Sequence, residues 1–276
     1  MIALAVACLV LSTTWLAALT LTDFRQIRRT DANLRVYRVG SGWTNPHKLT
    51  ARWSAAWVGL GTATGLVPVV VFGDSKVAEI VAMLSCGGLI IWSTYSRKLR
   101  TCVVPLASAL LLYFSARLYT NLPAVWLAGM FASFFASQLY FVAGIRKLQS
   151  RHFMSGRVLV DNLAYGIYQA AAGNREFIKL ASLSRLADLL CNKTFLYACR
   201  LAAVLTAVVE LAIGLGTLGL LPATLIFAVA IPSHLAFILI SPRRIVPFVV
   251  AAFGLVVLAM THPMLSSVLK MFPWMT

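Results

Sequence analysis

The sequence predicts an all-α protein, a polytopic bundle of about eight transmembrane helices that forms a single domain over residues 1–276. Three observations lead to this fold class. Apolar residues make up 60% of the chain, against roughly 45–50% in soluble domains. Charged residues make up only 12%, against about 25% in soluble domains. Apolar stretches of about 20 residues, the length that crosses a bilayer, recur along the chain.

The predicted spans are eight windows of mostly apolar residues. They lie at about 2–22, 52–72, 77–95, 101–119, 123–145, 195–219, 221–240 and 245–268. A helix satisfies its backbone hydrogen bonds internally, which is the condition for crossing hydrocarbon. The first window lacks the basic residues that precede the apolar part of a secretory signal, so we interpret it as a retained helix.

The stretch between the fifth and sixth windows, residues 146–194, contains no complete span. Its apolar residues recur at spacings of three and four, with charged residues between them. This pattern predicts two amphipathic helices that lie in the membrane interface and are separated near Gly173 and Asn174.

The net charge of +16 follows from the predicted topology. With eight spans, 21 of the 24 lysines and arginines fall on one side, and only Lys76, Arg117 and Lys270 fall on the other. Short cytoplasmic loops carry most of the basic residues in membrane proteins. We therefore expect cytoplasmic basic loops, both termini outside, and anionic membrane lipids as partners. Nucleic-acid binding is not needed to explain the charge.

Motifs of soluble enzymes and of metal sites are weak in this chain. The five cysteines form no CxxC pair and the four histidines have no ligand-like spacing, so no metal site is predicted. Residues 214–219 fit the dinucleotide motif G-x-G-x-x-G, but they lie inside an apolar window and follow no strand. We interpret Ala212 and Gly216 instead as small residues that allow close helix packing.

Ionisable residues inside spans are functional candidates because charge is costly there. Glu210 lies near the middle of the sixth window, and its partner must come from another helix. His234 is the natural candidate, because it follows Pro232, which frees backbone groups for polar contacts. The alternative is a single hydrogen bond between helices that only orients the bundle.

Lys147 lies at the end of the fifth span, two residues past its apolar window and directly after Arg146. The pattern by itself is typical of a flanking cation that reaches to the interface. If the interfacial helices cover Lys147 and exclude water, its neutral amine is favoured and becomes a usable base. The two alternatives differ in whether the side chain is enclosed.

The string YFVAGIRKLQSRHFMSG, residues 140–156, resembles a motif in the membrane domain of vitamin K-dependent γ-carboxylases and their bacterial relatives, the HTTM proteins. The shared pattern is an aromatic pair, Ala-Gly, an apolar residue, two basic residues and Leu, within a membrane core of about residues 50–255. The resemblance implies that Lys147 is the catalytic base and that Glu210 and His234 are site residues. It also implies a reduced, vitamin K-like quinone as cofactor and the bacterial inner membrane as location.

Three functions remain open from the sequence. The first is modification or maturation of a peptide by carboxylase-like chemistry, with a peptide substrate and a second protein subunit as partners. The second is a non-catalytic membrane subunit that docks a partner protein. The third is a carrier of small solutes or protons with Glu210 and His234 on the proton path, although the inverted repeats typical of carriers are not visible.

Overall fold

The structure is a computed structural model that describes residues 1–28, 37–39, 42–44, 46–72, 75–93, 101–119, 123–174 and 176–263. The end of the last apolar window and part of the basic loops lie outside these residues. The basic positions concerned are Arg29, Arg35, Arg97, Lys98, Arg100, Arg175 and Lys270.

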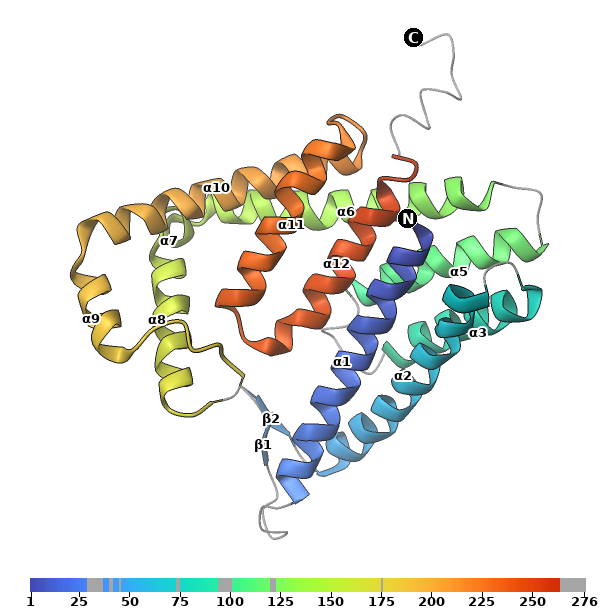
Figure 1. Ribbon diagram of the computed structural model, residues 1–276, viewed down its shortest axis with the longest axis horizontal. Helices are drawn as coiled ribbons and strands as arrows, with labels where there is room; N and C mark the ends of the chain where they lie inside the picture. The colour runs from blue at the N-terminus through green and yellow to red at the C-terminus, as the bar shows by residue number, and fades with distance from the viewer. Residues whose placement is uncertain are drawn as a thin grey trace. The chain divides into compact units, whose positions relative to one another are not determined.

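A helix lies in each of the eight apolar windows (Figure 1). They are α1 (Ile2–Arg28), α2 (Pro46–Phe72), α3 (Lys76–Ser93), α5 (Val103–Tyr119), α6 (Ala124–Gln149), α10 (Lys193–Thr217), α11 (Ala223–Ile240) and α12 (Val246–Ala259). Among the described residues, four of these helices, α1, α6, α10 and α11, are long and apolar enough to cross a membrane. The predicted helical character is therefore confirmed, and the length and composition of these four helices are compatible with an integral membrane protein.

A short strand pair is an addition to the predicted all-α class. Strand β1 (Tyr37–Val39) pairs antiparallel with β2 (Gly42–Thr44), so that Tyr37 lies opposite Thr44. A single 3₁₀ turn, η1 (Arg243–Ile245), precedes α12.

The stretch between α6 and α10 forms three helices, α7 (Arg151–Met154), α8 (Arg157–Ala171) and α9 (Leu183–Cys191). The predicted break near Gly173 is confirmed, because α8 ends there and Gly173 has a φ of +80°, in the left-handed region that favours glycine. The single turn α7 was not predicted. It begins after Ser150, whose hydroxyl oxygen accepts a hydrogen bond from the Phe153 N–H at 3.2 Å.

The chain forms two compact units, and the first consists of Met1–Ala128 and Val250–Leu258. In it α1, α2, α3 and α5 pack in chain order, each against the next. Gly254 of α12 also belongs to this unit. A Cβ atom at that position would lie 2.8 Å from side-chain atoms of both Cys8 and Leu106, so the glycine permits close packing of three helices.

The second unit consists of Gly129–Val249 and Ala259–Thr276. Helices α6 and α10 run side by side in opposite directions (Figure 1). Near the start of α6, the Ser133 hydroxyl donates to the Thr217 carbonyl oxygen at 2.5 Å. Further along α6, the ring of Phe141 lies 3.3 Å from the position that a Cβ at Gly214 would take. These contacts fix an antiparallel register between the two helices.

Gly216, in the glycine-rich string 214–219, allows close packing of two helices, as predicted. A Cβ at Gly216 would lie 2.1 Å from the side chain of Ile226 in α11, so the absence of a side chain lets α10 and α11 approach. Gly219 has a φ of +93° in the turn between these two helices.

Candidate functional site

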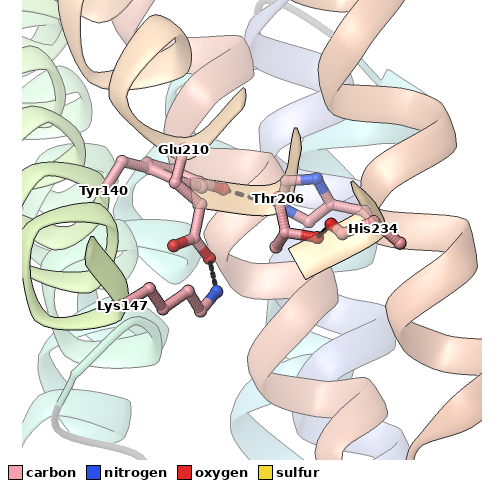
Figure 2. A network of polar contacts seen from close by, with 6 residues as sticks. Tyr140, Lys147, Thr206, Glu210 and His234 are labelled. Carbon is pink, nitrogen blue, oxygen red and sulfur yellow. Dashed lines mark hydrogen bonds and ion pairs between the residues drawn. The ribbon is translucent and has the colours of Figure 1, made fainter. Parts of the chain in front are cut away.

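Lys147 and Glu210 form an ion pair within the second unit (Figure 2). Lys147 lies in the last turn of α6, and its Nζ donates to Oε1 of Glu210 in α10. The side chains are largely enclosed, with 21% of Lys147 and 18% of Glu210 exposed. The partner of Glu210 comes from another helix, as expected. The expectation that this partner is His234 is wrong, because the register of α6 against α10 brings Lys147 to the carboxylate.

Gly144 explains how the two side chains can meet. On α6, Gly144 lies one turn before Lys147. It faces α10 at a point within one helical turn of Glu210. A Cβ at Gly144 would lie 2.9 Å from the Leu211 side chain and 3.2 Å from the Ala207 carbonyl oxygen. Only a residue without a side chain permits this separation of the two backbones, and the close approach places Lys147 within reach of Glu210.

Lys147 lies near the end of α6, but α10, which carries its partner Glu210, extends well past this point. The part of α10 from Lys193 to Glu210 is about 25 Å long at 1.5 Å per residue. Helices α7, α8 and α9 pack against α10. The buried ring of Phe153 in α7 lies with its centroid 5.3 Å from Nζ of Lys147. Glu210 and Phe153 therefore both lie against the ammonium end of the Lys147 side chain.

The second carboxylate oxygen of Glu210, Oε2, is buried and has no hydrogen-bond partner among the described residues. A buried acceptor without a donor costs about 1–3 kcal/mol. The ammonium group of Lys147 has three N–H donors, and its contact with Oε1 uses one of them. The acceptor Oε2 and the remaining N–H donors of Lys147 therefore lie next to each other. A hydroxyl group of a bound molecule can donate to this acceptor and accept from one of these donors.

His234 of α11 forms a second polar pair, with Tyr140 of α6 (Figure 2). Its Nδ1 lies 2.6 Å from the Ala230 carbonyl oxygen, and its Nε2 lies 2.6 Å from the Tyr140 hydroxyl oxygen. Because a carbonyl oxygen only accepts, Nδ1 carries the hydrogen. In the neutral ring, Nε2 then accepts a hydrogen bond from the Tyr140 hydroxyl.

The three predicted site residues all lie in the second unit, on three different helices. Lys147 and Glu210 are in direct contact, whereas His234 is tied to the same helix α6 through Tyr140. Tyr140 was not predicted as a site residue. Its spacing of seven residues from Lys147 was an available signal, because such positions share one face of a helix.

The arrangement is suited to acid–base chemistry. An amine and a carboxylate in contact can share a proton, and a tyrosine hydroxyl with a fixed histidine tautomer lies two turns away on the same helix. The described residues contain no group of three or more His, Cys, Asp or Glu side chains that could hold a metal ion. In comparisons with known proteins, no family model, curated protein or solved structure matches this chain.

Proposed function

We propose that this chain is an integral membrane protein in which Lys147 acts as a base in the modification or maturation of a peptide, with a reduced quinone as membrane-soluble cofactor. The observation that carries the proposal is the contact of Lys147 with Glu210 beside a buried oxygen that lacks a donor. The resemblance of residues 140–156 to the γ-carboxylase motif supports the same role for Lys147.

The ion pair gives Lys147 a route to its neutral form. When the ammonium proton moves to Glu210, two opposite charges become a neutral amine and a neutral carboxylic acid, which an apolar surrounding tolerates better. The nitrogen lone pair then accepts a proton from an acidic hydroxyl of the substrate. An N–H bond forms, an O–H bond breaks, and the negative charge remains on oxygen next to the new ammonium group.

The residues present fit a hydroquinone. Oε2 of Glu210 can accept a hydrogen bond from a phenolic hydroxyl, and Lys147 has donors for the resulting oxyanion. When bound, a reduced quinone supplies the oxygen-dependent redox chemistry that yields a base strong enough to deprotonate a peptide. The part of this chain is to bind the hydroxyl, hold it beside the amine and exclude water.

We also propose that all eight long helices cross the bacterial inner membrane, with both termini outside, basic loops in the cytoplasm, and α8 and α9 in the interface. An ion pair between Glu79 at the start of α3 and Arg117 at the end of α5 supports this topology. Eight crossings place those two helix ends on the same side. A stripe of exposed apolar side chains on α10, including Leu201, Leu205 and Val208, is suited to lipid contact.

The test is deprotonation of a hydroquinone by the purified full-length protein. Under anaerobic conditions, a vitamin K-type hydroquinone is added and the ultraviolet absorbance of its anion is followed. Wild type is expected to produce the anion, and Lys147→Ala to lose at least about 100-fold in its rate of formation. Lys147→Arg is the matched control, because arginine keeps the positive charge and the ion pair but is not a base at neutral pH.

The two variants show whether Lys147 acts as a base or serves only as a positive charge. If Lys147→Arg retains the activity of wild type, the lysine serves only as a charge and the proposal is wrong. Peptide mass spectrometry of cells that express wild type or Lys147→Ala then tests the peptide product, which is expected only with wild type. The alternative of a proton carrier with Glu210 and His234 on one path is less favoured, because these residues have different partners.

A further inference from the structure

Four arginines lie around the short helix α7. Arg146 precedes Lys147 at the end of α6, Arg151 begins α7, Arg157 begins α8, and Arg200 lies in the first half of α10. All four are exposed. In the part of the chain that the structure describes, none of their side chains forms an ion pair. We name this group the arginine cluster.

One contact of α7 and one contact of the turn that follows it bring the backbone positions of these arginines near one another. Phe153 of α7 lies against Lys147, which places α7 on the end of α6 beside Arg146. Gly156, between α7 and α8, has a φ of +80°, and a Cβ there would lie 2.5 Å from the backbone nitrogen of Arg200. The backbone of Gly156 therefore abuts α10 at Arg200, and Arg157 follows directly.

The positive charge of the cluster is not balanced by the acidic residues near it. Glu210 is already paired with Lys147. Asp161 lies one turn after Arg157 on α8, but it is exposed and forms no ion pair among the described residues. Cationic side chains that extend from neighbouring backbone positions repel one another, and an anion between them relieves this repulsion. Guanidinium groups bind phosphate oxygens through paired N–H donors, which makes phosphate a well-matched anion.

The surroundings of the cluster favour a phosphate that is attached to lipid. On α10, directly after Arg200, the exposed side chains Leu201, Leu205 and Val208 follow at helical spacing. An amphiphile with its phosphate at Arg200 can lay its acyl chains along this apolar stripe. We propose that the arginine cluster binds the phosphate group of an anionic phospholipid. This inference does not depend on the chemistry at Lys147.

The test is native mass spectrometry of the full-length protein in detergent, titrated separately with phosphatidylglycerol, phosphatidylcholine and inorganic phosphate. Wild type is expected to retain one phosphatidylglycerol more tightly than the other two ligands. Each basic residue near an anionic headgroup contributes about a fivefold gain in affinity, so Arg157→Gln with Arg200→Gln should lose about 25-fold. The matched control is Lys179→Gln with Arg185→Gln, which removes the same charge from exposed positions outside the cluster.

The outcomes distinguish a lipid-binding site at the arginine cluster from general electrostatic attraction of anionic lipids to the protein. If the control loses as much affinity as the cluster variant, or if wild type retains no phosphatidylglycerol, the proposal is overturned. If inorganic phosphate binds as tightly as phosphatidylglycerol, the ligand is free phosphate and the lipid assignment is wrong. A melting temperature like that of wild type confirms that the variants fold, and Arg157→Lys with Arg200→Lys should recover part of the affinity. If the double glutamine variant unfolds, Arg200→Gln alone should still lose about fivefold.

Discussion

Each of the two units contains an ion pair between two of its helices, but the pairs are built differently. In the first unit, Nε of Arg117 lies 2.8 Å from Oε1 of Glu79. Glu79 lies in the first turn of α3 and Arg117 in the last turn of α5, where the partial charges of the helix ends favour them. Arg117 also donates through Nη1 to the Tyr113 hydroxyl at 3.2 Å. This pair is well satisfied and stabilises the contact of α3 with α5.

In the second unit, only Lys147 is at a helix end that favours its charge. Glu210 lies inside α10, and its Oε2 has no partner among the described residues. The second pair therefore leaves hydrogen-bonding capacity unused, at a cost in stability. An ion pair between helices can thus be fully satisfied, as that of Arg117 with Glu79 is, or can leave a buried acceptor without a donor, as that of Lys147 with Glu210 does.

Removing Arg117 should have the largest effect on stability. Arg117→Leu leaves the carboxylate of Glu79, only 6% exposed, without its cation. We expect the free energy of unfolding in detergent to fall by about 3 kcal/mol, and Arg117→Lys to recover part of it. A loss below about 1 kcal/mol, typical of exposed ion pairs, would remove the contrast between the two units.

Replacing both members of the second pair should be far less costly than removing one. Lys147→Met alone is expected to lower the free energy of unfolding by about 2 kcal/mol, because Glu210 loses its cation. Adding Glu210→Leu should return stability to within about 1 kcal/mol of wild type or above it, since the unsatisfied oxygen is also removed. Denaturant titrations of the single and double variants measure this coupling. If the double variant is as unstable as the single one, the pair of Lys147 with Glu210 stabilises the contact between its helices as the pair of Arg117 with Glu79 does.

Close packing at Gly144 can be tested against a glycine with open surroundings. Gly144→Ala is expected to cost about 1.5 kcal/mol, because the new methyl group meets Leu211 and Ala207 and forces α6 from α10. It should also weaken hydroquinone deprotonation by Lys147. Gly87→Ala in α3 is the control, since no atom beyond its own stretch of the helix backbone lies within 4 Å of the added Cβ. There the better helix propensity of alanine should stabilise by about 0.5–1 kcal/mol. Equal effects at both positions would contradict this account of the α6–α10 contact.

The smallest expected effect is that of Tyr140→Phe, which removes the hydroxyl from Nε2 of His234. The loss of one hydrogen bond should lower the free energy of unfolding by about 1 kcal/mol. Nitrogen NMR of the imidazole should still show the hydrogen on Nδ1, because the Ala230 carbonyl oxygen continues to accept it. A change of tautomer would show that Tyr140, and not Ala230, determines the protonation of the ring.

The positions of the long helices were predictable because a run of about 20 apolar residues has few stable alternatives to a helix in a membrane. Lys147, Glu210 and His234 were predicted as site residues, and in the structure each makes a polar contact with a residue of another helix, although Glu210 meets Lys147 and not His234. The same reasoning should have selected Glu79, an acid inside an apolar helix, but it was not among the predicted residues. The catalytic and binding roles of Lys147, Glu210 and His234 stay predictions.

The places where helices form could be read from the order of the amino acids, because backbone hydrogen bonding and apolar periodicity are local properties. That order also showed which side chains are costly to bury. The contacts of Glu210 with Lys147 and of His234 with Tyr140 became visible only in the folded chain. The physical reason is that pairing depends on the register between two helices, which is set by close contacts such as those of Gly144 and Gly216. No spacing along a single helix carries that information.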